Sequence, residues 1–445
     1  MFRKYFTSAK VIPLSFLAAI LIGAGLLMLP AATAPGQTTD FLTAAFTSTT
    51  SLCVTGLTVV DISLHWSLFG KIIILFLIQI GGLGIIAVAS LLMMMLKKRF
   101  PLSQFIILHD SFNLDSMSGL LKFLKNVFKG VFAVEGFGAL VYMIVFIPRF
   151  GFLRGIWISL FTSVSAFCNA GIDIFGPDSL VSWSSNALVL INTMVLIVLG
   201  GLGYVVWFDL IQSIREKRKK LLSAHSRLVL SVTAFLIVMG AVLIFILEYS
   251  NPKTLGPMSV GDKILNSFFQ SVTFRTAGFA TVPQEGLRET SVFLGLLLMF
   301  IGGSPIGTAG GVKTVTAFFV LQGSISFIRG RNEVVVFRRR VSGEMMKKAS
   351  AIVIVSFSAI FVLLIILLAS NPLSLTDASY EVFSAMGTVG LTRAITPTLT
   401  AFGKVIIITA MYLGRISPIS MAFFFSRGAT DRNSLRYAKG RFYIG

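Results

Sequence analysis

The sequence predicts an all-α protein that crosses a membrane several times, and its composition is the first reason. Of the 445 residues, 55% are hydrophobic and only 13% are charged, and the mean hydropathy is +0.88. A soluble protein of this length needs far more polar surface, so most side chains must face lipid or other buried helices. Several apolar runs also reach the roughly 20 residues that a helix needs to span a bilayer. The alternative, a large soluble helical core, does not account for these runs.

The first apolar run, residues 11–29, follows Arg3, Lys4 and Lys10, an arrangement that a signal peptide also has. The run has 19 residues, whereas the apolar core of a signal peptide has about 7 to 15. A retained first transmembrane helix is therefore the better interpretation. The two cysteines, Cys53 and Cys168, provide neither a disulfide framework nor the spacing of metal ligands.

The net charge of +20 is concentrated in a few places. Of 38 lysines and arginines, 27 lie at the N-terminus or in residues 97–129, 215–227, 329–348 and 427–441. This pattern follows the positive-inside rule, which places the basic clusters and both termini in the cytoplasm. The surplus positive charge is thus explained first by membrane topology, and only second by attraction to anionic lipid or an acidic partner. We therefore expect the chain to lie in a lipid bilayer and to bind no nucleic acid.

Between successive basic clusters one pattern recurs four times: an apolar span, a short semi-polar segment, a turn of small residues and a longer apolar span. The predicted pairs of spans are 11–29 with 68–96, 130–147 with 187–211, 228–248 with 291–327, and 350–369 with 402–426. Eight crossings give every unit the same orientation, so the repeats are parallel rather than inverted. We expect four parallel repeats of helix, pore helix with turn, and helix around one pseudo-fourfold pore.

These repeats divide the chain into successive parts. Residues 1–96, 127–214, 228–328 and 349–426 are expected to form repeats 1 to 4, with cytoplasmic linkers at 97–126, 215–227 and 329–348 and a cytoplasmic tail at 427–445. No segment has the composition of a separate soluble domain, so we expect regulation to come from another protein.

The four turns align on a shared glycine. They read SLCVTGLT (51–58), AFCNAGID (166–173), TFRTAGFA (273–280) and AMGTVGLT (385–392). Ten residues before the shared glycine each repeat has an aromatic residue: Phe46, Phe161, Phe268 and Tyr380. A short helix fits into each interval and must end at the turn.

A second motif supports this alignment. The outgoing spans contain IGGLG (80–84), LGGLG (199–203), IGGSP (301–305) and LGRIS (413–417). The first glycine of this motif follows the glycine of the turn by 25, 29, 24 and 24 residues. Two independent motifs at nearly equal spacing in four copies are hard to obtain by chance.

The turns have the chemistry of an ion filter. Non-helical backbone at membrane depth is tolerated only where it lines a watery cavity or is buried in protein. Glycine permits positive φ angles that point consecutive carbonyls inward, and rings of carbonyls replace the hydration shell of a monovalent cation. The negative C-terminal end of the preceding short helix faces the same place. The predicted filter consists of Val54, Thr55, Gly56, Asn169, Ala170, Gly171, Thr276, Ala277, Gly278, Thr388, Val389 and Gly390, with potassium bound at its glycines.

TVGLT (388–392) also resembles the TVGYG signature of potassium channels, while the other three copies are degenerate. Glycines that only permit close helix packing are the alternative, since glycine is common in membrane helices. One copy could be explained in that way, but four copies in matched context favour the filter.

The third outgoing span indicates a gate. Residues 291–328 form an apolar stretch of 38 residues, about twice what a bilayer requires. Its middle, GGSPIGTAGG (302–311), cannot continue as a regular helix because Pro305 and five glycines break it. We expect an intramembrane gating loop at about 302–313, made of Gly302, Gly303, Ser304, Pro305, Gly307, Thr308, Ala309, Gly310, Gly311 and Lys313. A passive kink or a re-entrant packing element is the alternative.

Arg415 is the second gate candidate, because it stands where the other repeats have Gly82, Gly201 and Gly303. A cation deep inside a span is costly and marks a pathway by default. Beneath the filter it would repel potassium. The alternative is that it pairs with a carboxylate or with carbonyls only to hold helices together.

Four other residues within the repeats stand out. Arg275 is expected to brace the filter from behind, and Cys53 and Cys168, at the corresponding repeat position, to be small packing residues. Glu135 lies inside a span near its expected cytoplasmic end, and no role follows from the sequence.

The fourfold arrangement, with SVTFRTAGF (271–279) and FIGGSPIGTAGGVKT (300–314), resembles the Trk/Ktr/HKT superfamily of potassium uptake proteins over essentially the whole chain. It is most similar to the KtrB family, the membrane subunits of bacterial Ktr systems. The resemblance implies a selectivity filter that prefers potassium, since serine in the first turn of that family goes with sodium permeation and this chain has Gly56. It also implies a gating loop after the third filter turn and a basic residue in the last helix.

The same resemblance implies partners and a location. It points to the bacterial plasma membrane, to a homodimer in which each subunit has its own pore, and to a KtrA-like cytoplasmic ring that binds ATP or ADP. The chain itself is expected to bind no cofactor, with the potassium ion as its substrate.

Three other function classes compete with a gated pore. Catalysis has no support, because GTAGGVKT (307–314) lacks the ending of a phosphate-binding loop and no nucleophile–base pair or metal set is present. An ion-coupled sodium–potassium symporter is the serious competitor of a gated pore. A scaffold that only anchors a cytoplasmic complex would not need four matched turns.

Overall fold

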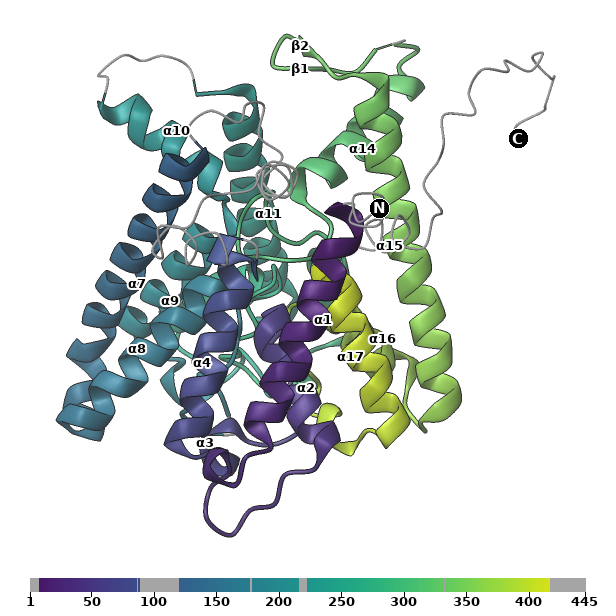
Figure 1. Cartoon of the computed structure of the whole chain (residues 1–445). Coiled ribbons are helices and arrows are strands. Elements are labelled where there is room, and N and C mark those ends of the chain that lie inside the picture. The colour runs from purple at the N-terminus through teal and green to yellow at the C-terminus, as the bar shows by residue number, and fades with distance from the viewer. Residues whose placement is uncertain are drawn as a thin grey trace, which may run out of the picture.

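The computed structural model describes residues 8–85, 87–88, 120–176, 178–215, 222–331 and 333–416. Within these ranges the regular structure is helical except for a small antiparallel hairpin of β1 (Val335–Val336) and β2 (Arg339–Arg340). The longest helices run side by side, with the hairpin at one end and α3 (Ile62–His65) at the other (Figure 1). We call these two ends the hairpin face and the α3 face.

Four long helices begin the successive units: α1 (Ser8–Leu27), α7 (Leu120–Phe150), α11 (Ala224–Glu248) and α15 (Gly343–Ser370). In the described part of the chain, α7, α11 and α15 are each long and apolar enough to cross a membrane alone. Many of their apolar side chains are exposed; Phe137 on α7, for example, is 69% exposed. Such side chains would be costly in water, so these surfaces are suited to lipid.

The long helices begin earlier than the sequence predicts. α7 begins at Leu120 rather than at residue 130, and α15 begins at Gly343 rather than at residue 350. The expected linkers 97–126, 215–227 and 329–348 therefore each include the first residues of a helix. The remaining parts of two of these linkers, and the tail 427–445, fall largely outside the described residues.

Four shorter helices follow the long ones: α2 (Phe41–Cys53), α8 (Phe152–Cys168), α12 (Val260–Thr273) and α16 (Leu375–Gly387). Side chains of Asp40, Ser259 and Ser374 accept hydrogen bonds from the first turns of three of them, which fixes where those helices begin. Three of the helices end three residues before their glycine, and α12 ends five residues before it.

The outgoing helices are α4 (Leu68–Leu83), α9 (Ala187–Gly201), α13 (Glu289–Phe300) and α17 (Ala401–Ile416). The expected single span 187–211 is wrong, because α9 ends at Gly201 and α10 (Tyr204–Arg215) leaves it at an angle of 100°. Gly203, at φ 89°, lies at this bend. After α13 no helix covers 301–313, and α14 (Thr314–Ile328) begins beyond this interval.

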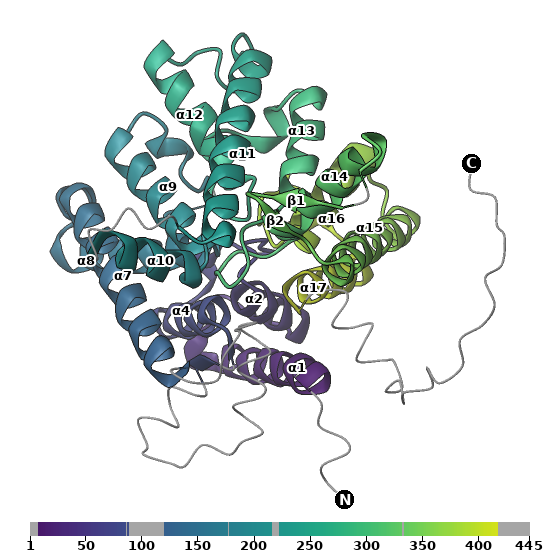
Figure 2. The same cartoon turned by 90° about the horizontal axis from the view of Figure 1, so that it is seen from above.

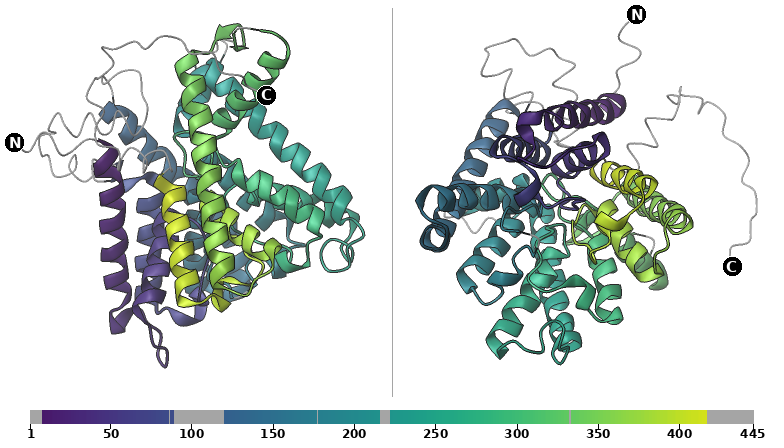
Figure 3. Two further views of the ribbon diagram at one scale, coloured as in Figure 1. Left: turned by 90° about the vertical axis from the view of Figure 1, so that its right-hand side faces the viewer. Right: turned by 90° about the horizontal axis from the view of Figure 1, so that it is seen from below.

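Packing between the units is circular. Each outgoing helix contacts the short helix of the next unit: α4 packs on α8, α9 on α12, α13 on α16, and α17 returns to α2. Viewed from the hairpin face, the chain proceeds in order around a common centre (Figure 2). The view from the α3 face shows the same order (Figure 3). Short 3-10 turns lie in the loops Pro30–Ala32, Val181–Trp183, Gln284–Gly286 and Thr396–Thr398.

Candidate ion filter and gate

The four glycine turns share one backbone conformation. The residue two positions before each glycine is left-handed, with φ of 57° at Val54, 60° at Asn169, 68° at Thr276 and 51° at Thr388. The glycines have φ of 107° at Gly56, 62° at Gly171, 81° at Gly278 and 94° at Gly390. Non-glycine residues rarely adopt this region, so four such residues in matched positions indicate a functional constraint.

The turns meet one another in a closed ring. A Cβ atom on Gly56 would lie 2.7 Å from the carbonyl oxygen of Ala170, and one on Gly171 would lie 2.6 Å from that of Ala277. A Cβ atom on Gly278 would lie 2.7 Å from the carbonyl oxygen of Val389.

Gly390 closes the ring, because its Cβ atom would overlap the carbonyl of Thr55. In every turn the carbonyl of the residue just before the glycine, which we call the middle carbonyl, thus faces the glycine of a neighbouring turn. All twelve residues predicted for the filter lie in these four turns.

Hydroxyl groups that the sequence analysis missed hold the turns in place. The backbone N–H of Gly56 donates to Thr50 Oγ1 at 2.9 Å, and that of Gly390 donates to Ser384 Oγ at 3.1 Å. In the second turn Ile172 N–H donates to Ser165 Oγ at 3.1 Å, and in the third Thr273 Oγ1 donates to the carbonyl of Phe279 at 2.6 Å. A hydroxyl five or six residues before each glycine was the available sequence signal.

Several polar atoms in the turns have no protein partner among the described residues. They are Thr55 Oγ1, Asn169 Oδ1 and Thr388 Oγ1, all buried. A buried oxygen without a partner costs free energy unless water or a cation satisfies it. These atoms therefore add acceptor capacity beside the carbonyl ring.

A cavity of about 580 Å³ opens from the ring toward the α3 face. The glycines of all four turns line it, and its lining within the described residues also includes Asp61, Asp173, Asp178 and Glu285 but no lysine or arginine. A concave surface with acids and no bases raises the local cation concentration. We call this cavity the acidic vestibule.

On the other side of the ring, the segment 301–313 crosses beneath the turns. Its backbone is tied to the end of α9, since Ser304 N–H donates to the Gly201 carbonyl at 2.9 Å and Thr308 N–H donates to the Gly200 carbonyl at 3.1 Å. Tyr204 N–H, at the start of α10, donates to the Ile306 carbonyl at 2.9 Å. The unexpected bend after α9 thus holds this segment through backbone hydrogen bonds.

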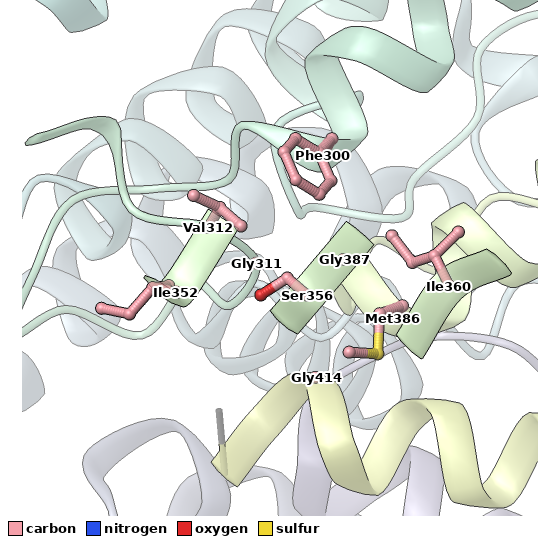
Figure 4. Close-up of a pocket in the computed structure, with 9 residues that line it drawn as sticks. All are labelled: Phe300, Gly311, Val312, Ile352, Ser356, Ile360, Met386, Gly387 and Gly414. Atoms are coloured by element: carbon pink, nitrogen blue, oxygen red, sulfur yellow. The ribbon is translucent and has the colours of Figure 1, made fainter. Parts of the chain in front are cut away.

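The same segment touches the fourth turn directly. A Cβ atom on Gly310 would overlap Thr388 Oγ1, and one on Gly311 would lie 3.4 Å from the Gly387 carbonyl. Figure 4 shows Gly311 and Val312 beside Met386 and Gly387 at the end of α16, around a small cavity of about 30 Å³. The segment is therefore in contact with the fourth turn on its hairpin side.

Arg415 links the segment to the end of α4. Its guanidinium donates to the carbonyl of Thr308 in the segment and to that of Gly81 at the end of α4. Lys313 turns back on the segment and donates from Nζ to the Ala309 carbonyl at 2.6 Å. The structure thus brings the two predicted gate elements together.

Of the other residues singled out in the sequence, Arg275 is buried and donates to the Gly302 carbonyl at 3.2 Å, so it contacts the segment that follows α13. Cys53 and Cys168 are buried free thiols. Of the four aromatic residues that stand ten positions before a glycine, Phe46, Phe161 and Tyr380 are fully buried and Phe268 is half-buried. Glu135 lies in the middle of α7 rather than near its end, because α7 begins ten residues before the expected span.

The chain is similar to known transport proteins along nearly its whole length. Residues 7–435 match the TrkH family, described as "Cation transport protein". The Ktr system potassium uptake protein B of Bacillus subtilis is 37% identical over 99% of this chain and 97% of its own length. The potassium/sodium uptake protein NtpJ of Enterococcus hirae is 37% identical over 95% of this chain and 93% of its own.

A solved structure has the same fold. The crystal structure of the potassium transporter TrkH from Vibrio parahaemolyticus matches with a TM-score of 0.77 at 16% identity, over 96% of this chain and 86% of that one. A resemblance at this low identity supports the fold alone. The family match and the full-length relatives, which are cation transport proteins rather than enzymes, show that this chain belongs to the TrkH family of cation transport proteins.

Proposed function

We propose that this chain carries potassium into bacterial cells across the plasma membrane, as the membrane subunit of a Ktr-type uptake system. The observation that carries the proposal is the closed ring of four turns, each presenting its middle carbonyl to a neighbouring glycine. Carbonyl oxygens in such a ring replace the water shell of a monovalent cation. The names of two full-length relatives, a potassium uptake protein and a potassium/sodium uptake protein, both include this substrate.

In this proposal the four units are parallel repeats of helix, pore helix with turn, and helix around one pseudo-fourfold pore, with eight crossings. The circular packing of α4 on α8, α9 on α12, α13 on α16 and α17 on α2 supports it. Ions enter from the acidic vestibule, pass the ring and meet the segment 302–313. That segment is the gate, and Arg415 holds it closed.

The hairpin face is proposed to be cytoplasmic, together with both termini. Arg338, Arg339 and Arg340 are exposed there on the hairpin, as the positive-inside rule requires. A KtrA-like nucleotide-binding ring would dock on this face and act on α14, which directly follows the gate segment. A homodimer of this chain, with one pore in each subunit, completes the proposed assembly.

The first test is cation flux into liposomes that contain the purified protein, with a potassium gradient alone, a sodium gradient alone, or both. We expect potassium to move down its own gradient without any second ion. A carbonyl ring provides a path for one ion and does not require a co-transported ion to bind. Rubidium should move similarly and sodium more slowly by about tenfold or more.

A sodium–potassium symporter is the second candidate. The name of the Enterococcus relative, a potassium/sodium uptake protein, includes both of the ions that such a symporter would carry. The same liposomes decide between the two. Potassium flux that stops unless sodium is present on the same side would favour the symporter and contradict a gated pore.

The acidic vestibule predicts that uptake depends on the pH of the α3 side. Burial raises the pKa of Asp173 to about 6, and the nearby Asp61 acts in the same direction. Asp173 is therefore charged above pH 6 and attracts cations there, and this attraction is lost as the pH falls through 6. We expect initial potassium uptake at low salt to fall by about two- to threefold between pH 7 and pH 5.

The matched variant is Asp173→Asn, which should show at both pH values about the rate that the wild-type protein has at pH 5, and so lose most of the pH dependence. An equally steep profile in this variant would show that another group is responsible.

A further inference from the structure

Glu135 is a buried acid with no part in the filter or the gate as described so far. It lies in the middle of α7 and is only 3% exposed. Among the described residues its carboxylate forms no salt bridge. An ionisable side chain inside a membrane span is costly, and its presence points to a function.

The internal repeats show that this position does not require an acid. In three units a serine of the short helix donates its hydroxyl to a backbone carbonyl of the long helix three residues before a glycine. These bonds run from Ser48 to Ile20 at 2.7 Å, from Ser163 to Glu135 at 2.6 Å, and from Ser271 to Ile237 at 2.8 Å. The glycines Gly23, Gly138 and Gly240 are equivalent too, because a Cβ atom on each would contact the same serine. Glu135 therefore stands where two other repeats have isoleucine.

The carboxylate of Glu135 is held from the first repeat. Gln79 on α4 donates from Nε2 to both carboxylate oxygens, at 3.1 and 3.3 Å. α4 is the outgoing helix of the first unit, and it packs on α8 of the second. The pair thus joins two units at the level where α8 ends.

Both side chains contact Cys168, the last residue of α8. Its Sγ lies 3.8 Å from Glu135 Oε1 and 3.9 Å from Gln79 Oε1. On another side Gly82 leaves the thiol its space, since a Cβ atom there would lie 2.5 Å from Sγ. Cys168 is thus enclosed by Gly82, Gln79 and Glu135, and the next residue, Asn169, is the left-handed first residue of the second filter turn.

We propose that Glu135 is a specificity-determining positioning residue: with Gln79 it fixes Cys168, and so holds the second filter turn at the position that favours potassium over sodium. This inference rests on the proposed filter. The carbonyl of Ala170, two residues after Cys168, faces Gly56 of the first turn. A shift of Cys168 would therefore change the ring where the first and second units meet.

The decisive variant is Glu135→Ile, which gives the second repeat the residue of the first and third. We expect its potassium-to-sodium permeability ratio, measured in liposomes under opposed gradients of the two ions, to fall by about tenfold. Glu135→Gln keeps a group of the same shape that can bond Gln79, and should retain the ratio within about twofold.

Gln79→Leu removes the same contact from the other helix and should lower the ratio as Glu135→Ile does. The double variant should have a permeability ratio no lower than that of either single variant, because the two substitutions remove one shared interaction. Tyr142→Phe is the matched control. It removes a buried hydrogen bond of the same helix, 2.6 Å long, to Thr193 Oγ1 on α9 rather than to a residue of the turns, and should leave the ratio unchanged.

The outcomes separate this inference from the proposed function. If the wild-type protein does not discriminate potassium from sodium, the filter proposal itself fails. If the wild-type protein discriminates, and either Glu135→Ile or Gln79→Leu conducts with an unchanged ratio, the positioning role is overturned. A lowered melting temperature with an unchanged ratio would likewise show that the network serves stability alone. Should Glu135→Ile not fold, Gln79→Leu gives the answer by itself.

Discussion

Replacing Gly56 by serine is expected to lower the potassium-to-sodium permeability ratio by at least about tenfold, which corresponds to about 1.4 kcal/mol. Gly56 has φ 107°, and a Cβ atom there would lie 2.7 Å from the Ala170 carbonyl oxygen and 3.1 Å from Gly390 Cα. The first turn must therefore move, and the ring changes shape at its contacts with two neighbours. The ratio is measured in liposomes under opposed potassium and sodium gradients.

Gly36→Ser is the matched control for this substitution. Gly36 also has a positive φ, 83°, but a Cβ atom there would meet nothing within 4 Å. It imposes the same type of backbone strain away from the ring, so it should lower stability without changing selectivity. Equal ratios in Gly56→Ser and the wild-type protein would contradict the carbonyl ring as the selective element.

Replacing Arg415 by alanine is expected to raise potassium flux in the absence of any partner protein. The guanidinium donates to the carbonyls of Thr308 and Gly81, and so ties the segment 301–313, the proposed gate, to the end of α4. Two hydrogen bonds from a charged donor contribute about 3 kcal/mol together. If they are made only in the closed state, their loss shifts the gate toward opening by about 100-fold.

Arg415→Lys separates the two ways in which this residue could act. Lysine keeps the positive charge that repels cations but cannot reach two carbonyls with a rigid fork. If the bridge closes the gate, flux in Arg415→Lys should approach that of Arg415→Ala. Flux like that of the wild-type protein would instead assign the effect to charge. An unchanged or lower flux in Arg415→Ala, with protein that still folds, would remove Arg415 from the gate.

Much of the architecture was predictable because unusual backbone conformations require particular residue types, which can be recognised in a sequence. Four aligned glycines predicted four turns, and each of them has a positive φ in the structure. Pro305 and its neighbouring glycines predicted that no helix continues through 302–311, and none does. Such features depend on local sterics, which the residue type alone determines.

The bend after α9 was missed for a different reason. LGGLG (199–203) is followed by the apolar residues of α10, so hydropathy continued where the helix did not. Gly84 and Gly203 both have φ 89° just after the ends of α4 and α9, and a glycine at a helix C-terminus is a known stop signal. The motif therefore contained the information that the apolar run concealed.

The surroundings of Glu135 could not be predicted in the same way. Its partners Gln79 and Cys168 lie 56 and 33 residues away, on helices whose rotation about their own axes decides which side chains meet. Only the packing of α4, α7 and α8 brings the three side chains together. The comparison with Ile20 and Ile237 also became possible only once the serine contacts identified the equivalent positions.

The central claim is that the four turns form a cation site together. Crystals grown in rubidium and examined by anomalous scattering test it most directly, because rubidium replaces potassium and its position is observed independently of transport. We predict a peak at the centre of the ring, beside the carbonyls of Thr55, Ala170, Ala277 and Val389. Peaks confined to other places, with none at the ring, would contradict the account.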